Sequence, residues 1–454
     1  MDYDIVAGVG PNKVLVVGAG KSGLAVARFC ASRGAQVTIS DQRGPNELGS
    51  AMRDHALRGA AWELGGHVLE TFTSADLIVL SPGVPELDEV KAARARGIHI
   101  TGEVELASRF IQAPIVAITG TNGKSTVTAL AGEIAMHTGR PTFVGGNLGT
   151  PLISCIGTPA ASVKGIVVVE LSSFQLETCE TLKPLAAALL NLTPDHLDRY
   201  EDLNAYGAAK LRIALRMGNE ALVVNRDDPF FYEATKDRWN KYYYSTRQRV
   251  DRGGFVDGAE LVLALDEGEE RYPTAEMNLI GRHNQGNALA ALLLLRASGL
   301  ATPAQARAGL KKFQPLPHRM QLVGEKRGVR YYDDSKATNV DSVVAGLDGF
   351  PVPFALIAGG RHKGGSYAPL AAALRANPCR GVVLIGEAAD KIARTIAENP
   401  PAVRAKSMED AIVQATAMVG AGGAVVLSPA CSSYDMFDNY EHRGRVFQAA
   451  VESL

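Results

Sequence analysis

Short, strongly apolar runs alternate with stretches of helical pattern along most of this chain. Runs at 13–17, 37–40 and 77–80 have the composition of buried strands, and residues 22–33 carry a helical pattern between the first two. Buried strands that are joined through helices form parallel sheets with helices on their faces. The alternation therefore predicts an α/β fold.

The alternation falls into three cycles. The second opens at residue 114 with a strand at 115–118, a helix at 125–137, a strand at 165–170 and a helix at 284–298. The third follows the proline-containing segment 314–317, which cannot continue a helix, and has strands at 329–332, 354–358, 382–385 and 424–427. We expect three domains, at 1–113, 114–314 and 315–454, which agrees with 454 residues at about 150 per domain. Residues 247–273 alternate only weakly.

The composition excludes several classes of function. With 47 basic and 48 acidic residues the formal charge is −1, which argues against a diffuse basic surface for nucleic acid. Five widely spaced cysteines without a C-x-x-C pair favour a reducing compartment over disulfides or a zinc ribbon. The acidic start is unlike a signal peptide, and the longest apolar run, 288–295, is far shorter than the roughly 20 residues of a membrane span. We expect a cytoplasmic protein.

A glycine-rich turn, Gly18-Ala-Gly20-Lys-Ser22-Gly23, follows the first predicted strand, and Asp41 ends the second. Such glycines let the backbone approach a diphosphate at a helix N-terminus, while the acid holds a ribose hydroxyl. The pattern indicates a site for a nucleotide diphosphate, of which a nicotinamide cofactor is one option. Glycines needed only for a tight turn are the alternative.

A second glycine-rich turn, Gly120-Thr-Asn-Gly-Lys124-Ser125-Thr, follows the strand at 115–118. It is a shortened phosphate loop, because the position of the usual first glycine holds Ile118. Backbone N–H groups of such a loop cradle phosphates, the lysine neutralises the β/γ oxygens and the hydroxyl reaches Mg²⁺. The turn predicts an ATP site in a P-loop domain.

Acidic side chains that could serve a metal follow other strands. Glu170 ends the strand at 165–170, and the turn Thr193-Pro-Asp195-His196 combines an acid with an imidazole. A solvated strand end and a helix cap are the plain structural alternatives. Lys210, on its own pattern, is a solvated helix lysine.

Polar loops also follow three strands of the third domain, at 333–339, 359–365 and 428–433, and His318 and Arg319 lie at its linker. Open α/β sheets bind ligands at the carboxyl ends of their strands. Together the loops indicate a ligand site, although their composition does not name the ligand.

Over essentially its full length the chain resembles the Mur ligases, the ATP-dependent amide-forming enzymes of peptidoglycan precursor synthesis. The telling stretches are the phosphate loop and the runs at 170–177, 191–196, 316–319, 334–339 and 428–433. The run Asp334-Ser-Lys-Ala-Thr-Asn339 resembles the D-glutamate-adding branch of that family. The resemblance implies a Rossmann-like N-terminal domain, a P-loop ATPase-type central domain and a Rossmann-like C-terminal domain.

The resemblance also implies a reaction. The γ-phosphoryl group of ATP moves to the carboxylate of UDP-N-acetylmuramoyl-L-alanine, and the amine of D-glutamate then displaces phosphate from the acyl phosphate. Implied cofactors are ATP and two Mg²⁺ ions, with a carbamylated lysine at Lys210, which replaces the solvated interpretation of that residue. A monomer without nucleic-acid or membrane partners is expected.

The resemblance assigns residues to each ligand. It gives catalysis to Lys124, Glu170, His196, Lys210 and Arg319, and the metal to Ser125, Glu170, His196 and Lys210. It gives ATP to Gly120, Thr121, Asn122, Gly123, Lys124, Ser125, Thr126, Asn284, Asn287, His318, Arg319 and Asp334. It gives the UDP substrate to Gly18, Gly20, Ser22, Gly23, Asp41, Arg43, Ser81, Gly83, Asn147 and His196, and D-glutamate to Lys336, Thr338, Lys363, Ser433 and Tyr440.

The chain departs from the family pattern in three places. Arg361-His362 replaces an acidic-glycine pair, Tyr440 stands where phenylalanine is familiar, and the segment between His196 and Lys210 is one residue shorter. Alternatives to the D-glutamate ligase are a Mur-type ligase for another amino acid, a folylpolyglutamate synthase, a non-catalytic nucleotide-binding regulator and a Rossmann oxidoreductase. The last of these leaves the phosphate loop unexplained.

Overall fold

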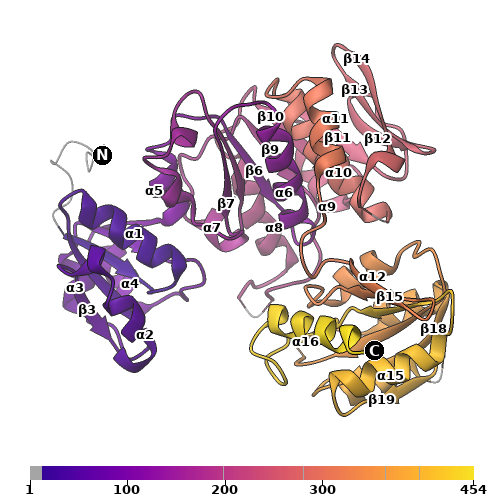
Figure 1. Cartoon of the computed structure of the whole chain (residues 1–454). Coiled ribbons are helices and arrows are strands. Elements are labelled where there is room, and N and C mark those ends of the chain that lie inside the picture. The colour runs from indigo at the N-terminus through magenta and orange to yellow at the C-terminus, as the bar shows by residue number, and fades with distance from the viewer. Residues whose placement is uncertain (1–12, 198, 280, 363, 398) are drawn as a thin grey trace.

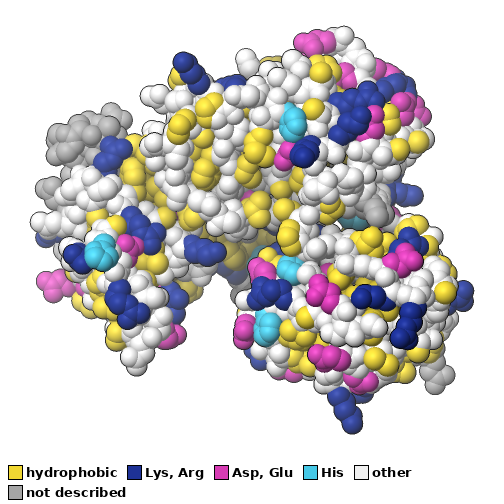
Figure 2. Space-filling view, viewed as in Figure 1, with side chains coloured by type: hydrophobic (Ala, Val, Ile, Leu, Met, Phe, Trp, Pro, Cys, Tyr) yellow, Lys and Arg dark blue, Asp and Glu magenta, His cyan; other side chains and the backbone are white. Residues whose placement is uncertain are grey.

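A computed structural model describes residues 13–197, 199–279, 281–362, 364–397 and 399–454. Three sheets follow one another along the chain, each covered by helices, and the helix and strand labels are those of Figure 1. The predicted three-domain α/β fold is confirmed. Figure 2 shows that one face of the molecule is hollowed between the N-terminal and C-terminal domains, below the central domain.

The N-terminal sheet has five parallel strands in the order β3-β2-β1-β4-β5. The apolar run of β1 is buried on both faces, as its continuous Val/Leu sequence predicts. The elements are β1 (Lys13–Val17), α1 (Lys21–Ser32), β2 (Gln36–Asp41), α2 (Pro45–Met52), β3 (Ala61–Leu64), α3 (Leu69–Ser74), β4 (Leu77–Leu80), α4 (Asp88–Ala95), β5 (His99–Gly102) and α5 (Glu103–Ser108).

The central sheet has nine strands in the order β14-β13-β12-β11-β10-β9-β6-β8-β7. Its strands are parallel from β7 to β12, and an antiparallel hairpin, β13 and β14, extends one edge. The elements that build it are β6 (Ile115–Thr119), α6 (Lys124–Met136), β7 (Thr142–Gly146), β8 (Ile166–Glu170), α7 (Ser173–Glu177), β9 (Ala186–Leu189), α8 (Leu203–Leu211), β10 (Ala221–Asn225), α9 (Pro229–Thr235), β11 (Lys241–Ser245), β12 (Gly253–Asp257), β13 (Glu260–Leu265), β14 (Gly268–Pro273), α10 (Arg282–Ala297) and α11 (Pro303–Lys312).

The C-terminal sheet has six strands in the order β15-β16-β20-β17-β18-β19, of which only the β15–β16 pair is antiparallel. Helix α16, at the end of the chain, packs beside β15 and β16 (Figure 1). The elements are β15 (Gln321–Lys326), β16 (Val329–Asp333), α12 (Val340–Leu347), β17 (Phe354–Gly359), α13 (Ala368–Ala376), β18 (Cys379–Ile385), α14 (Ala389–Ile396), β19 (Ala402–Arg404), α15 (Met408–Val419), β20 (Ala424–Leu427) and α16 (Tyr440–Glu452).

Every strand and helix predicted from the sequence is present, with ends shifted by at most a few residues. The weakly alternating segment 247–273 contains β12, β13 and β14, whose exposed edge carries charged residues that dilute the apolar pattern. Short or alanine-rich strands such as β3, β5 and β9 were not predicted, because too few large apolar residues mark them. Among the described residues, no helix is both long and apolar enough to cross a membrane.

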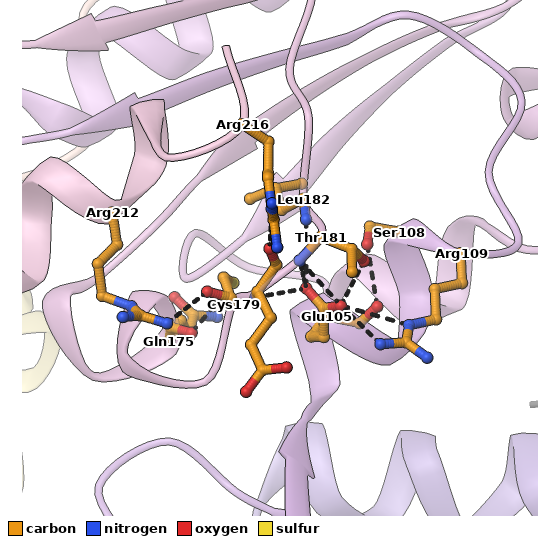
Figure 3. A network of polar contacts seen from close by, with 10 residues as sticks. Glu105, Ser108, Arg109, Gln175, Cys179, Thr181, Leu182, Arg212 and Arg216 are labelled. Atoms are coloured by element: carbon orange, nitrogen blue, oxygen red, sulfur yellow. Dashed lines mark hydrogen bonds and ion pairs between the residues drawn. The ribbon is translucent and has the colours of Figure 1, made fainter. Parts of the chain in front are cut away.

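Helix α5 ties the N-terminal domain to the central domain. The Glu105 carboxylate of this helix accepts hydrogen bonds from the backbone N–H groups of Glu180, Thr181 and Leu182, of which Figure 3 labels the last two. The neighbouring Glu103 accepts a hydrogen bond from the N–H of Ile153 at 2.6 Å. One continuous apolar cluster runs from β1 and α1 through α5 into β6 and β8, so the two domains share a core.

Candidate active site

In each domain the predicted site loops follow three neighbouring strands. The loops at Gly18, Asp41 and Ser81 end β1, β2 and β4, and in the central domain the phosphate loop stands between the ends of β8 and β9. In the C-terminal domain the three polar loops follow β16, β20 and β17. The topology therefore gathers residues that are far apart in sequence at one edge of each sheet.

The phosphate loop joins β6 to α6 and is held by the loop after β9. The N–H of Asn122 donates to Asn191 Oδ1 at 2.8 Å, and Asn191 Nδ2 donates back to the Asn122 carbonyl at 3.0 Å. Gly123 has φ +84°, and a Cβ there would lie 2.5 Å from Asn287 Oδ1, so only glycine fits the turn. The loop is thus pre-shaped by its neighbours rather than by its own sequence alone.

Lys124 folds back onto this loop. Its Nζ donates to the carbonyls of Gly120 and Thr121 at 2.8 and 2.7 Å, and burial lowers its pKa below the ordinary lysine value. Ser125 and Thr126, which follow it in the first turn of α6, are buried, whereas Lys124 itself is partly buried. An ammonium group held only by carbonyls at a helix N-terminus is well placed for an entering phosphate.

Glu170, at the end of β8, has one satisfied and one unsatisfied carboxylate oxygen. Oε1 accepts from Asn147 Nδ2 at 2.7 Å, while Oε2 is buried and has no hydrogen-bond partner among the described residues. A buried carboxylate oxygen without a partner is costly unless a cation is bound. Asn147, predicted to contact substrate, is therefore also the residue that orients Glu170.

Lys210 is buried, which contradicts its plain interpretation as a solvated helix lysine. Its Nζ donates to the Gly120 carbonyl at 2.9 Å and lies 4.2 Å from the centre of the Tyr206 ring. Burial lowers its pKa well below the ordinary lysine value, and the nearby charge of Lys124 lowers it further. The packing that buries the amine therefore disfavours its charged form.

His196 lies in the turn after β9 with φ +55°, an uncommon backbone conformation for a non-glycine residue. Its ring stands edge-on to Phe174, with the ring centres 4.9 Å apart, and 6.0 Å from the Tyr206 ring. Its side chain is 45% exposed, in contrast to Glu170 and Lys210. The aromatic cluster of Phe174, His196, Tyr200 and Tyr206 connects it to Lys210.

His318 and Arg319 reach the site from the linker to the C-terminal domain. His318, at φ +61°, bonds through Nδ1 to Asp333 Oδ2 at 2.6 Å, and Gln448 of α16 donates to the same oxygen. Arg319 is partly buried where the charges of Glu170 and Asp334 both act on it, and desolvation lowers its pKa. The linker thus brings a guanidinium group opposite the carboxylate that ends β8.

The loop after β16 contributes Asp334 and Lys336. Asp334 accepts from Ser428 Oγ at 2.6 Å and from the Met320 N–H at 3.2 Å, and burial raises its pKa to about 7. Lys336 lies 3.8 Å from the centre of the Tyr440 ring, and burial together with Arg319 lowers its pKa to about 8. Ser433 is buried in the loop after β20, Thr338 lies in the β16 loop, and Lys363 falls outside the described residues.

The central and C-terminal domains touch at the phosphate loop. Ser342 Oγ, in the first turn of α12, donates to Asn122 Oδ1 at 2.8 Å. Asn284 and Asn287 of α10 stand on the central side of this junction, with Asn287 Nδ2 donating to Asn284 Oδ1 at 3.0 Å. Residues predicted for ATP therefore line the central side of this junction, and α12 of the C-terminal domain faces them.

The glycine loop of the N-terminal domain is closely packed. Ser81 Oγ donates to the Gly18 carbonyl at 2.8 Å, and a Cβ on Gly23 would lie 1.9 Å from that carbonyl oxygen. Asp41 accepts from the Ala19 N–H at 2.6 Å and from Arg43, whose charge and hydrogen bonds hold the pKa of Asp41 at about 2. Gly20, Ser22 and Gly83 lie around the same loop, with Gly83 at φ +87°.

Two residues at the site were not assigned a role from the sequence. Asp333 holds His318, and Asn191 holds the phosphate loop. Both follow the apolar part of a strand, as Glu170 does, and this position is the sequence feature that could have identified them as site residues. Their partners lie 15 and 69 residues away in sequence, so only the fold reveals what they do.

Three family models match successive parts of the chain. They are described as the Mur ligase MurD-like N-terminal domain, over residues 12–102, the Mur ligase middle domain, over 118–295, and the Mur ligase glutamate ligase domain, over 318–431. Together they span the N-terminal loop, the phosphate loop and the loops after β16 and β17.

Relatives and solved structures agree with these models. Proteins named UDP-N-acetylmuramoylalanine--D-glutamate ligase from Pelobacter propionicus and Anaeromyxobacter dehalogenans are each 46% identical, covering 98% and 96% of this chain and 99% and 96% of their own. The fold is similar to that of a pseudomurein peptide ligase type C from Methanothermus fervidus (TM-score 0.62, 19% identity, 97% of this chain and 99% of that one). It is also similar to UDP-N-acetylmuramate-alanine ligase MurC from Thermotoga maritima (TM-score 0.61, 19% identity, 97% and 99%).

Proposed function

This chain belongs to the Mur ligase family, and we propose that it joins D-glutamate to UDP-N-acetylmuramoyl-L-alanine while ATP is converted to ADP and phosphate. As a Mur ligase it is an ATP-dependent ligase of peptidoglycan precursor synthesis, and the oxidoreductase alternative falls away. The observation that carries the choice of amino acid is the 46% identity, over 98% of this chain, to a relative named for D-glutamate. The run at 334–339 supports the same choice.

The proposed chemistry has two steps. A carboxylate oxygen of the L-alanyl group attacks the γ-phosphorus of ATP, and the bond to the β,γ-bridging oxygen breaks, giving an acyl phosphate and ADP. The free amine of D-glutamate then attacks the acyl carbon, loses a proton, and phosphate leaves as the amide forms. Neither step requires a covalent bond to the protein, so positioning and charge stabilisation supply the rate enhancement.

Lys124 and Arg319 are proposed to neutralise the triphosphate. Among the described residues, the hydrogen-bond acceptors of Lys124 are the carbonyls of Gly120 and Thr121, which phosphate oxygens can replace. Arg319 approaches from the linker and lies within the electrostatic reach of Glu170. One group comes from each domain, so the charge around the γ-phosphoryl group is complete only when the two domains meet. His318, Asp334, Asn284 and Asn287 are proposed to hold adenine and ribose at that junction.

The residues at the end of β8 fit Mg²⁺. The described residues contain no group of three or more His, Cys, Asp or Glu side chains that could hold a metal ion alone. Mg²⁺ bound with a nucleotide instead uses one or two protein ligands together with phosphate oxygens and water. Glu170 with its unpartnered Oε2, Ser125, His196 and a carbamylated Lys210 would hold such ions. Bound there, Mg²⁺ supplies positive charge to the phosphate oxygens.

Carbamylation of Lys210 is proposed because the residue is buried and burial lowers the pKa of its amine, which favours the form that attacks CO₂. The Lys210 nitrogen would attack CO₂ and lose a proton, which turns a cation into an anion. A buried cation beside Lys124 is unfavourable, whereas a carbamate in the same place is attracted to Lys124 and to a metal ion. The position near the Gly120 carbonyl sets the new group beside the phosphate loop.

The two remaining ligands are proposed to enter from opposite sides. Lys336, Thr338, Lys363, Ser433 and the backbone at Tyr440 would bind the carboxylates of D-glutamate. Lys336 carries a positive charge below its pKa of about 8, as an anion site requires. The glycine loop with Ser22, Arg43, Ser81 and Gly83 would bind the uridine diphosphate handle, whose remote binding orients the reacting carboxylate.

Release of inorganic phosphate tests the proposal. Purified protein receives Mg²⁺, ATP and UDP-N-acetylmuramoyl-L-alanine, with D-glutamate, L-glutamate and other amino acids offered in turn. We expect sustained phosphate release when D-glutamate is the amino acid offered and not when another one is. Lys124→Ala should release phosphate at least 10³-fold more slowly, which corresponds to about 4 kcal/mol of transition-state stabilisation. Release with a different amino acid would assign the chain to another Mur-type ligase, and no release with any would refute the proposal.

A further inference from the structure

Arg199 bridges the N-terminal and central domains. Its Nη1 donates to the carbonyl of Val84, in the loop after β4, at 3.0 Å. Its Nη2 donates to Glu177 Oε2, at the end of α7, at 2.8 Å. The guanidinium carbon lies 4.7 Å from the centre of the Phe174 ring. One side chain therefore has three contacts, of which one is in the first domain and two are in the second.

The end of the bridge in the N-terminal domain lies on the glycine loop. A Cβ on Gly18 would lie 2.9 Å from Ser81 Cβ and 3.3 Å from Val84 Cγ2, so the loop 81–84 packs directly on the Gly18 turn. Ser81 also donates to the Gly18 carbonyl. The Val84 carbonyl therefore belongs to a loop that packs on the one proposed to hold the diphosphate.

In the central domain, Arg199 lies next to the turn that carries His196. Arg199 comes three residues after His196 in sequence, and both side chains pack on the Phe174 ring. Glu177, which anchors the guanidinium group, also accepts from the Tyr200 hydroxyl at 2.5 Å. Tyr200 in turn packs on Tyr206, over whose ring Lys210 lies. The bridge thus starts from the same aromatic cluster that holds His196.

A pocket lies at the bridge and opens between the two domains. Ser81 and Gly83 line it from the N-terminal domain, and Gln175, Thr178 and Arg199 line it from the central domain. A substrate whose handle binds at the glycine loop and whose carboxylate reacts beside Glu170 must pass between these two sides. Arg199 lines this pocket on the central side and reaches the loop after β4 on the other, so a substrate that spans both domains would lie beside it.

We propose that Arg199 is a positioning residue, which sets the distance between the loop that holds the uridine diphosphate handle and the turn that carries His196. This inference rests on the proposed function. When the two sites are fixed relative to each other, UDP-N-acetylmuramoyl-L-alanine loses less conformational freedom on reaching the reactive arrangement. Arg199 therefore affects the binding of the spanning substrate and not the binding of a ligand that occupies one domain.

The Arg199→Ala variant distinguishes an effect on the spanning substrate from an effect on a ligand that occupies one domain. We expect the KM for UDP-N-acetylmuramoyl-L-alanine to rise at least tenfold, while the Kd of UDP alone, measured by calorimetry, changes less than twofold. The KM values for ATP and D-glutamate should also change less than twofold, because neither ligand meets the loop after β4. Arg199→Lys can reach one acceptor at a time, so it should fall between the wild type and Arg199→Ala.

Arg216→Ala is the matched control. Arg216 donates to the Glu180 carbonyl at 2.7 Å within the central domain and does not contact the loop after β4. Its variant should keep the wild-type Kd of UDP and the wild-type KM values for UDP-N-acetylmuramoyl-L-alanine, ATP and D-glutamate. The positioning role would be overturned if Arg199→Ala weakened the binding of UDP as much as that of the full substrate. It would also be overturned if the KM for the full substrate were unchanged. If the wild-type protein itself releases no phosphate, the proposed function has failed instead.

Discussion

At the scale of single residues, the site is built from ionisable groups that burial has moved away from their ordinary behaviour. Lys124, Lys210 and Arg319 all have lowered pKa values because burial disfavours a charge. Lys124 and Arg319 are the cations among them, and the charge of Glu170 acts on both. The nucleotide triphosphate proposed here would supply further negative charge to these two side chains.

Lys210 offers a direct test of the carbamate. Lys210→Ala removes the group that would become an anionic metal ligand, and we expect phosphate release to fall at least 100-fold. Added formate, acetate or propionate can enter the space left by the side chain and should restore part of the rate. Lys124→Ala, which removes a cation, serves as the control that carboxylates do not rescue. Absence of rescue by every acid would leave the carbamate without support.

Glu103 predicts how stability depends on pH. Burial raises its pKa from 4.5 to about 7, although the Ile153 N–H acts in the opposite direction. Between pH 4.5 and 7 the folded protein then holds a proton that the unfolded chain has released, so stability falls as the pH rises.

Glu103→Gln keeps an acceptor for Ile153 and removes the titration. The stability of the variant relative to wild type should therefore increase by on the order of 2 kcal/mol from pH 5 to pH 8. Thermal midpoints of both proteins across this range measure the difference. If the difference in thermal midpoint between the two proteins did not change with pH, Glu103 would be either ionised or protonated at every pH in this range.

At the scale of elements, α5 is the helix by which the first domain is docked. The side chain of Glu105 is 1% exposed and accepts from three successive backbone N–H groups, from the Thr181 hydroxyl and from Arg109 at 2.9 Å (Figure 3). Burial works against its ionisation, but the hydrogen bonds of Thr181 and Arg109 keep its pKa below the ordinary value. A short helix with few turns of its own is held by this one carboxylate.

Glu105→Ala should therefore destabilise the protein more than most single changes do. It leaves the N–H groups of Glu180, Thr181 and Leu182 without this acceptor, of which that of Leu182 is buried. An unsatisfied buried group costs roughly 1–3 kcal/mol, and we expect a loss of about 3 kcal/mol. Glu105→Gln keeps one oxygen acceptor and should lose less. Urea and thermal unfolding measure both variants, and equal stability of Glu105→Ala and wild type would contradict the docking role of the helix.

At the scale of the whole molecule, the cores divide the chain into two parts rather than three. The apolar cluster that contains β1 also contains β6 and β8, whereas the clusters of the C-terminal sheet include only residues from 329 onward. Phe29 of α1 packs edge-on against Phe110, 5.1 Å away, at the same junction. The C-terminal domain meets the phosphate loop through polar contacts such as Ser342 to Asn122, which can open and close.

Limited proteolysis should reveal this division. Lys311 and Lys312 are exposed in the last turn of α11, just before the linker. We expect trypsin to cut there first, giving a C-terminal fragment and a single fragment that keeps the first two domains together. ATP with Mg²⁺ should slow the cut, because the nucleotide is proposed to bind both sides of the junction. A first cut that separates the N-terminal domain would contradict the shared core.

The local parts of this protein follow from the order of its residues along the chain. Apolar runs marked the strands that are buried on both faces, and glycine patterns marked both nucleotide-type loops, because those features depend on residues that are neighbours in the chain. The family resemblance, which rests on motifs, named the reaction class. The roles of individual site residues stay predictions.

The tertiary structure decided what depends on distant partners. The sequence pattern of Lys210 is that of an exposed helix lysine, and only the packing of α8 against the phosphate loop buries it. Asp333, Asn191, Glu105 and Arg199 likewise have partners 15 to 115 residues away. Burial and long-range hydrogen bonds arise from how sheets and helices pack, and no local pattern encodes which groups they will bring together.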